Sequence, residues 1–144
     1  MPKRFTLAEA QRLIPRVEEL LREAIEIKAS YEEGEKQIQS IQERVMMMGG
    51  VSLDREKAAQ ARTQRDGAAA RLRNAIESVQ EAGCLIKDLD IGLIDFPTNY
   101  RGVEVYLCWK LGEDRIRFYH RQDEGFAGRK PLDPRDLGPG DKVQ

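Results

Sequence analysis

The sequence has few of the residues from which most catalytic and metal centres are built. Its 144 residues include one histidine and two cysteines, Cys84 and Cys108. A two-histidine zinc motif is therefore excluded, and the cysteines are too far apart for a C-x-x-C motif. The chain also lacks a P-loop, a nucleophile elbow and a dinucleotide-binding fingerprint. These absences exclude the commonest classes of enzyme that short motifs identify.

The sequence also lacks an excess of either charge and any long apolar run. Its 24 basic and 25 acidic side chains give a net charge of -1. Nucleic-acid binding needs a basic excess, so we expect none. No stretch approaches the roughly 18 apolar residues of a membrane span, and the segment 1–5 has no export signal. We expect a cytoplasmic protein with reduced thiols and no membrane contact.

The strongest pattern present is an apolar stripe in the first third of the chain. Apolar residues recur in alternating steps of three and four from Ala10 to Met48, interrupted only by Gly34. A stripe held over about five heptads is typical of one long helix packed along another, as in a coiled coil. Thr6 and Glu9 have the spacing of a capping box, which predicts the start of this helix. Pro15 predicts a kink near 11–15, or a separate short helix over 7–14.

A second helix is predicted to fold back on the first. Gly49 and Gly50 end the stripe, and an alanine-rich segment over 53–82 follows them, with Ser52 or Asp54 as its cap. Small side chains let two helices approach closely, and a short turn makes them antiparallel. Residues 7–82 are therefore predicted to form a helical hairpin.

Apolar residues that lie off the stripe need a partner. They can be covered by the rest of the chain or by a second copy, and we expect a homodimer. Met46, Met47 and Met48 are adjacent in the sequence and cannot all face inward. Flexible methionines suit partner binding, so the hairpin tip is a candidate surface for a protein partner.

The second half of the chain changes to an alternating pattern. It predicts strands over 103–110 and 115–121, with shorter candidates over 84–87 and 93–96. A two-residue turn at 112–113 would place Leu107 opposite Phe118 and Val105 opposite His120, and a turn at 113–114 would keep the same faces. We therefore expect His120 on the apolar face and Cys108 on the opposite face, which argues against a catalytic pair of the two.

These patterns together predict an α+β fold in a single domain over 1–144. It comprises a long antiparallel helical hairpin over 7–82 and a β-meander over 84–121 that forms a small antiparallel sheet of three to four strands. An irregular C-terminal arm rich in glycine and proline follows over 122–144.

Three carboxylates, Asp88, Asp90 and Asp95, lie within eight residues of one another among apolar neighbours. Carboxylates in a half-buried stretch need backbone amides, arginines or a cation as partners. They can form turns, or they can bind a ligand or a divalent cation, for which carboxylate oxygens are suitable ligands. They can also serve in acid/base catalysis.

The single histidine, His120, is the second candidate for chemistry. Its ordinary pKa suits proton transfer near neutral pH, and it can act as a metal ligand; its alternative role is as a satisfied core residue. A carboxylate–histidine pair forms if the sheet brings it near Asp95 or Glu113. Trp109 is interpreted as a core residue or a stacking surface. Arg129 can hold an anion or fasten the arm to a carboxylate.

Several segments of the second half stand out in a fixed order: Lys87-Asp-Leu-Asp90, Gly92-Leu-Ile-Asp-Phe-Pro97, Val105-Tyr-Leu-Cys-Trp109, Leu111-Gly-Glu113, Tyr119-His120 and Gly125-Phe-Ala-Gly-Arg129. In this order they resemble a family of small bacterial proteins, domain-of-unknown-function family 2203. The opening segments 5–10 and 13–15 are also similar, whereas Tyr119 stands where a tryptophan is expected. The resemblance implies a bacterial cytoplasmic protein and brings no established activity. It points to Asp88, Asp90, Asp95, Trp109, Glu113, His120 and Arg129.

Two functions compete at this stage. The first is a dimeric helical-hairpin protein with a small β head that acts by binding a partner. The second is a metal-assisted or acid/base hydrolase that uses His120 as base or ligand together with the cluster of Asp88, Asp90 and Asp95. No cofactor is established by the sequence, and a divalent cation is the candidate.

Overall fold

The computed structural model describes residues 4–137 of the chain. The chain divides into two compact units: Glu23–Ala75, and Met1–Arg22 together with Ile76–Gln144. Helices α1 (Leu7–Met48) and α2 (Ser52–Glu81) each contribute residues to both units. In the described residues, no helix carries an apolar stretch long enough to cross a bilayer.

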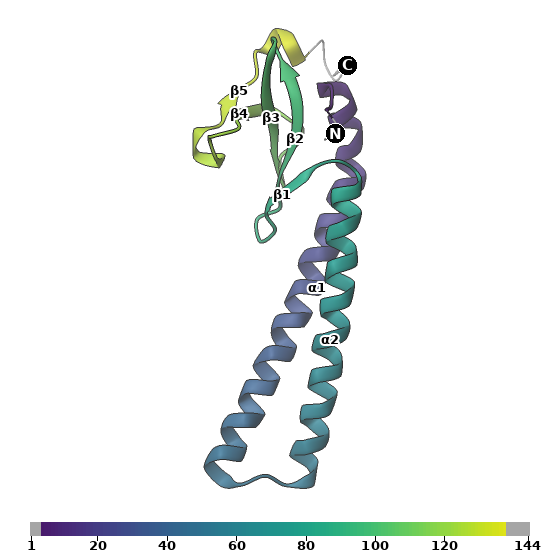
Figure 1. Cartoon of the computed structure of the whole chain (residues 1–144), viewed down its shortest axis with the longest axis vertical. Coiled ribbons are helices and arrows are strands. Elements are labelled where there is room, and N and C mark those ends of the chain that lie inside the picture. The colour runs from purple at the N-terminus through teal and green to yellow at the C-terminus, as the bar shows by residue number, and fades with distance from the viewer. Residues whose placement is uncertain (1–3, 138–144) are drawn as a thin grey trace. The chain divides into compact units, whose positions relative to one another are not determined.

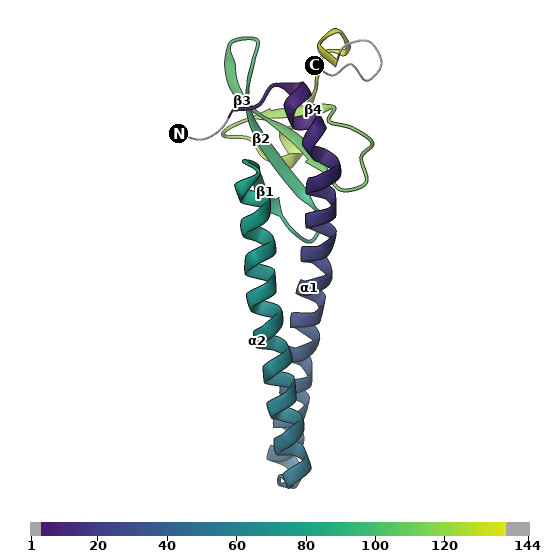
Figure 2. The same ribbon diagram turned by 90° about the vertical axis from the view of Figure 1, so that its right-hand side faces the viewer.

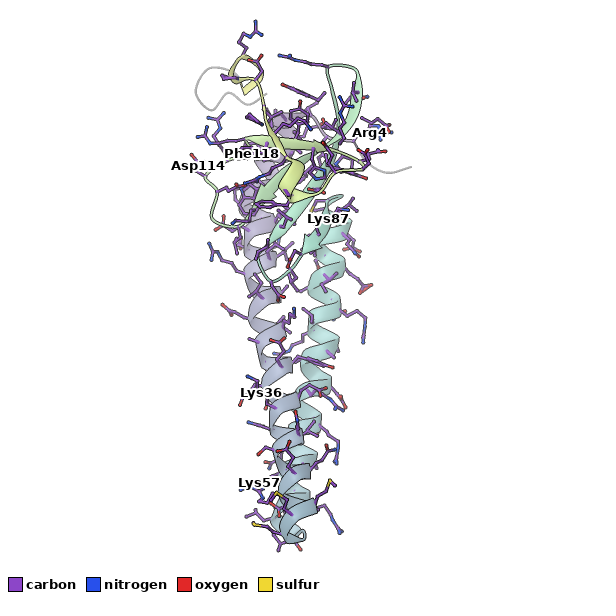
Figure 3. The ribbon with its side chains drawn as sticks, turned by 90° about the vertical axis from the view of Figure 1, so that its left-hand side faces the viewer. Arg4, Lys36, Lys57, Lys87, Asp114 and Phe118 are labelled. Carbon is purple, nitrogen blue, oxygen red and sulfur yellow. The ribbon has the colours of Figure 1, made fainter. Side chains whose placement is uncertain are left out.

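The unit Glu23–Ala75 is the antiparallel helical hairpin expected from the apolar stripe (Figure 1). The seam of α1 is buried at Ala24, Ile38 and Ile41, and α2 contributes small buried alanines such as Ala61 and Ala68. These small side chains let the two backbones approach closely. Lysines lie on the outside of the hairpin, as Lys36 and Lys57 do in Figure 3. The confirmed hairpin therefore owes its pairing to the stripe and to alanine.

Gly34, the single interruption of the stripe, lies at a close approach of the two helices. A Cβ atom at this position would lie 3.1 Å from Cβ of Arg65 and 3.4 Å from the carbonyl oxygen of Ala61. Beside it, Gln64 lies 3.5 Å from the Ser30 carbonyl, which adds a polar contact between the helices. Glycine here serves packing, and α1 continues through it without a break.

The start of α1 follows the predicted capping box. The Thr6 amide donates to Glu9 Oε1 at 2.9 Å, and the Glu9 amide donates to Thr6 Oγ1 at 3.1 Å. Pro15 lies inside one continuous helix, so the alternative of a separate helix over 7–14 is wrong. Pro15 is exposed, and water can hydrate the Gln11 carbonyl that lacks its helical donor.

The other unit contains a five-stranded antiparallel sheet, one or two strands more than expected, in the order β1-β2-β3-β4-β5. The strands are β1 (Leu85–Asp88), β2 (Leu93–Tyr100), β3 (Val103–Lys110), β4 (Phe118–Arg121) and β5 (Lys130–Pro131). Strands β2 and β3 are joined through Arg101 and Gly102, which both have positive φ, as a tight hairpin of primed type requires. The fifth strand comes from the arm that the sequence predicts to be irregular.

One face of the sheet forms the core of this unit. Phe96, Leu107 and Trp109 are almost fully buried there, against Val17 and Leu21 from the first turns of α1. Those turns lie in front of the sheet in Figure 2. This contact confirms that the apolar face of the meander rests on helix.

The register between β3 and β4 differs from the prediction. Leu107 pairs with Tyr119, and Cys108 pairs with Phe118, so both turns considered from the sequence give the wrong faces. The chain makes a longer connection over 111–117, because Ile116 leaves the strand and is fully buried in the core. Its amide donates to Gln11 Oε1 on α1 at 2.9 Å. The change of one residue reverses the face of every β4 side chain.

Candidate functional site

The face of the sheet opposite the core carries three side chains that can bind or transfer protons and metals. Asp95 on β2 pairs directly with Cys108 on β3, and His120 on β4 pairs with Tyr106, two residues along β3. Paired residues of antiparallel strands share a face, so the three side chains lie together. Asp95 and Cys108 are 0% exposed and His120 is 3% exposed. We call these three residues the outer-face cluster.

Two hydrogen bonds fix the ring of His120. Its Nδ1 lies 2.8 Å from the backbone oxygen of Arg121, and its Nε2 lies 2.9 Å from Oδ2 of Asp95. A carbonyl oxygen only accepts, so Nδ1 carries a proton. The Nε2–Oδ2 contact then needs one further proton, held either by the ring or by the carboxyl group. The pair is neutral overall in both forms, which suits a buried place.

Asp95 is the least compensated polar group of the cluster. Burial raises the pKa of its carboxyl group, and the hydrogen bond and positive charge of His120 oppose this rise. The Cys108 thiol is near enough to lower the pKa slightly, but it leaves Oδ1 without a hydrogen bond. Oδ1 is buried and has no hydrogen-bond partner among the residues that the structure describes. An oxygen in this state costs about 1–3 kcal/mol.

Cys108 completes the cluster with a sulfur donor. One ligand atom from each of Asp95, Cys108 and His120 lies within 4.8 Å of the other two. Burial, followed by the negative charge of Asp95, raises the pKa of the Cys108 thiol to about 11. The thiol is thus neutral at pH 7 in the absence of a cation. The expectation that Cys108 and His120 lie on opposite faces is wrong, because it rested on the register of β4.

The arm that follows β4 covers the cluster. Arg129 donates to both carboxylate oxygens of Glu113, at 3.2 and 2.6 Å, and its Nη1 lies 4.0 Å from Cys108 Sγ. Its guanidinium also stacks over the rings of Phe118 and Phe126, with distances of 4.0 and 4.3 Å to the ring centroids. Phe118 marks this side of the sheet in Figure 3. Arg129 therefore fastens the arm to a carboxylate, as one of its two sequence interpretations states.

The remaining sequence candidates lie outside the cluster. Trp109 is fully buried on the core face, and its indole donates to the Glu113 carbonyl at 3.1 Å. Asp88 ends β1 and Asp90 lies in the connection that follows; both are exposed, and Asp88 Oδ1 accepts the Asp90 amide at 3.0 Å. These two aspartates form a turn and do not join His120. Of the three neighbouring carboxylates, only Asp95 belongs to the site.

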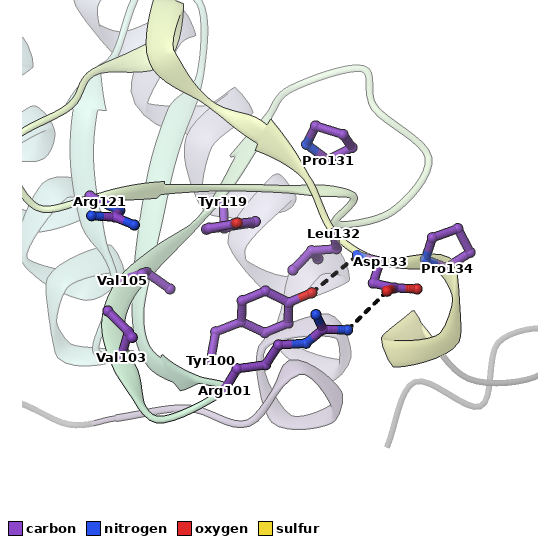
Figure 4. Close-up of a pocket in the computed structure, with 10 residues that line it drawn as sticks. All are labelled: Tyr100, Arg101, Val103, Val105, Tyr119, Arg121, Pro131, Leu132, Asp133 and Pro134. Carbon is purple, nitrogen blue, oxygen red and sulfur yellow. Dashed lines mark hydrogen bonds and ion pairs between the residues drawn. The ribbon is translucent and has the colours of Figure 1, made fainter.

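A second hollow in the same unit contains none of the sequence candidates. It has a volume of about 650 Å³ and is lined by Tyr100, Tyr119, Arg121 and residues of the arm. Figure 4 shows how Asp133 closes one end: its amide donates to the Tyr100 hydroxyl at 3.1 Å, and its carboxylate accepts from Arg101 at 2.9 Å. The hollow lacks a cluster of buried titratable groups such as that of Asp95, Cys108 and His120, so it is a weaker candidate site.

The arrangement of the cluster is better suited to binding a proton or a cation than to catalysing the reaction of a substrate. A general base must reach its substrate within hydrogen-bond distance, directly or through one water. The reactive atoms of Asp95, Cys108 and His120 are buried, and Arg129 of the arm lies against Cys108. A mixed set of nitrogen, oxygen and sulfur donors in such a place is typical of a metal ligand set.

Sequence reasoning missed Cys108 and the aromatic cover from Phe118 and Phe126. A signal for Cys108 was present, because Asp95 and Cys108 both depart from the apolar pattern of neighbouring strands. Placing Cys108 beside His120 required the register between β3 and β4, and this register depends on how Ile116 packs.

The fold and site define an α+β protein with a helical hairpin and a small antiparallel sheet that buries an Asp–Cys–His cluster. Residues 3–132 match the model of a family described as an uncharacterized conserved protein, DUF2203, and the chain belongs to this family. No curated protein and no solved structure matches the chain. The expected family membership is therefore confirmed.

Proposed function

We propose that this protein is a bacterial, cytoplasmic interaction protein whose coiled-coil hairpin associates through its tip with a second copy of the chain. The observation that supports this most directly is the exposure of the tip. Met46, Met47 and Met48 are 86%, 83% and 75% exposed, and Val51 and Leu53 are also exposed. Contiguous exposed apolar patches commonly mark interaction surfaces.

A groove beside the methionines makes a second copy a suitable partner. It has a volume of about 980 Å³ and apolar lining from Ile41, Val45, Met46, Val51 and Ala58. In a two-fold dimer, the same patch contacts itself, so the methionines of each copy can fill the groove of the other. Methionine suits this role because its unbranched side chain adapts to irregular spaces.

The charges at the rim limit how two copies can meet. Asp54 is already paired with Arg44 at 2.6 Å, whereas Arg55 and Arg62 also line the groove. The two copies must keep these arginines apart, so the attraction comes from the methionines and the apolar lining. The hydrolase alternative receives less support, because His120 is buried and a substrate could not reach its ring without a rearrangement of the surrounding side chains.

Light scattering over a concentration series tests the proposal. The wild-type chain of 16.4 kDa should show the mass of a dimer. The triple variant Met46→Gln, Met47→Gln, Met48→Gln should dissociate at least ~100-fold more readily, because buried apolar anchors dominate interface energies. The matched control is Ile91→Gln with Val103→Gln, which removes exposed apolar groups from the other unit. A wild-type chain that is monomeric at every concentration, or a control that dissociates equally, would contradict the proposal.

A further inference from the structure

The outer-face cluster contains more ligating atoms than its hydrogen bonds use. A structural Asp–His pair accounts for the 2.9 Å contact between Oδ2 and Nε2. It does not account for the other oxygen of Asp95, which is fully buried without a hydrogen bond within the described part of the chain. Nor does it account for a thiol placed directly opposite that carboxylate on the neighbouring strand. The carboxylate of Asp95 and the thiol of Cys108 therefore both have lone pairs available within the cluster, where the ligand atoms lie within 4.8 Å of one another.

We infer that Asp95, Cys108 and His120 bind one divalent metal ion of the zinc class. The donor set of one carboxylate, one sulfur and one imidazole nitrogen is characteristic of zinc sites. The three ligands come from three adjacent strands, β2, β3 and β4, and a rigid sheet holds such ligands well. The fourth tetrahedral position is then open to water or to a small exogenous ligand.

The distances require only small adjustments. Ordinary zinc bond lengths place nitrogen and oxygen ligands about 3.3 Å apart, and sulfur about 3.5 Å from either. The 2.9 Å contact between Nε2 and Oδ2 must open slightly. The longest separation within the cluster, at most 4.8 Å, must close by roughly 1 Å, which side-chain rotation can provide. The metal takes the place of the proton that joins Nε2 to Oδ2, and Asp95 ligates it through Oδ2 with Oδ1, the oxygen that lacks a hydrogen bond, on the same ion.

The surrounding groups already have the orientation of a second coordination shell. The bond from His120 Nδ1 to the Arg121 carbonyl directs Nε2 toward the cluster, as metal-bound histidines usually require. Arg129 Nη1 lies 4.0 Å from Cys108 Sγ and can stabilise the thiolate. Glu113 holds Arg129 in this position through two hydrogen bonds.

The charge balance also favours a divalent cation. Binding converts the neutral pair of Asp95 and His120 and the neutral thiol of Cys108 into a carboxylate, an imidazole and a thiolate, and it releases two protons. The two negative ligands neutralise the cation, so no net charge is buried. The charged or titratable groups that the described contacts place on this face include Lys87, Tyr106, Lys110, Glu113 and Arg129, of which Glu113 and Arg129 neutralise each other. Affinity should therefore rise with pH.

Cobalt titration of the chelator-treated full chain is the primary test. One equivalent of Co²⁺ should produce a thiolate-to-cobalt charge-transfer band together with the intense visible bands of a tetrahedral site, and Zn²⁺ should abolish both. Cys108→Ser should lose the charge-transfer band, and Asp95→Asn should bind at least ~10-fold more weakly. Calorimetry in two buffers of different ionisation enthalpy should show the release of about two protons per ion.

Cys84→Ser is the matched control. Cys84 is equally buried, but its thiol donates to the Val79 carbonyl at 3.4 Å and it is not part of the cluster. This variant should keep the full cobalt spectrum. Absence of stoichiometric binding by the wild-type chain, or a charge-transfer band that persists in Cys108→Ser, would overturn the inference.

X-ray absorption on the zinc-loaded wild-type chain gives an answer that does not depend on the folding of any variant. The first shell should contain one sulfur at about 2.3 Å and nitrogen or oxygen ligands at about 2.0 Å. A shell with no sulfur, or with two, would overturn the inference. The cluster and the hairpin tip belong to different units, so this result and the dimer test are independent.

Discussion

Replacement of His120 by alanine should cost far more stability in the metal-free protein than the removal of one hydrogen bond. The ring is 3% exposed, and its partner Asp95 is 0% exposed, with one oxygen already lacking a hydrogen bond. The substitution leaves Asp95 in a buried place without its positive or hydrogen-bonding partner. Loss of one member of a buried pair typically costs about 3–5 kcal/mol. We expect this loss in the free energy of unfolding at pH 7.

Asp95→Asn should cost much less, about 1 kcal/mol, although it removes the same ion pair. The amide of asparagine can donate to Nε2 of a neutral His120, whose Nδ1 still donates to the Arg121 carbonyl. The side-chain volume is also nearly unchanged. The unequal costs of the two substitutions distinguish a shared-proton pair from simple packing.

The stability of the His120→Ala variant should also depend on pH in a definite direction. In His120→Ala, burial keeps the pKa of Asp95 above its ordinary value, and the histidine that opposes this rise is gone. The folded state then holds more protons than the unfolded state, so stability falls as pH rises above the ordinary carboxyl pKa of about 3.9. The slope should approach about 1.4 kcal/mol per pH unit until the folded-state pKa is reached.

Urea unfolding in the presence of a chelator, at intervals between about pH 4 and pH 8, measures these quantities. The double variant Asp95→Asn with His120→Ala is the control, and it should lose the pH-dependent part of the His120→Ala cost. A cost below about 1 kcal/mol for His120→Ala, or equal costs for both single variants, would refute the shared-proton description.

Three further predictions concern other parts of the molecule. Gly67→Ala should stabilise α2 by about 1 kcal/mol, because Gly67 is helical and a Cβ atom there meets nothing within 4 Å. Gly34→Leu should lower the free energy of unfolding by about 1–3 kcal/mol, because its side chain would collide with α2. Thermal unfolding of both variants tests this pair, and equal shifts in melting temperature would contradict the close approach at Gly34. Because burial raises the pKa of both Cys84 and Cys108 to about 11, neither thiol should react with a disulfide reagent at pH 8 until the chain unfolds, and fast reaction in the native state would contradict their burial. Arg129→Gln should increase amide hydrogen exchange in the arm while leaving exchange in the hairpin unchanged, and an unchanged arm would show that the arginine does not fasten it.

The helical part of the fold was predictable because its signals are local and repeated. The stripe from Ala10 to Ile41 specifies one buried face over many turns, so a single interruption at Gly34 or Pro15 does not change the outcome. The capping pair of Thr6 and Glu9 likewise acts over three residues. Local patterns of this kind need no knowledge of distant contacts.

The site was only partly predictable, because it depends on one non-local event. Asp95 and His120 were both candidates, and the structure brings them together, but Cys108 was rejected on the wrong register. The register is set by Ile116, which leaves its strand to fill the core and whose amide donates a hydrogen bond to Gln11 Oε1 on α1. No alternation within the strand itself reports that contact. The fifth strand was missed for a similar reason, since its pairing with β4 lies in a segment rich in turn residues.

The register between β3 and β4 decides whether the outer-face cluster exists, and nuclear Overhauser contacts across the two strands measure it most directly. Our description predicts backbone contacts between Cys108 and Phe118 and between Tyr106 and His120. Contacts of Leu107 with Phe118 and of Val105 with His120 would turn His120 into the core, separate it from Cys108 and contradict the site.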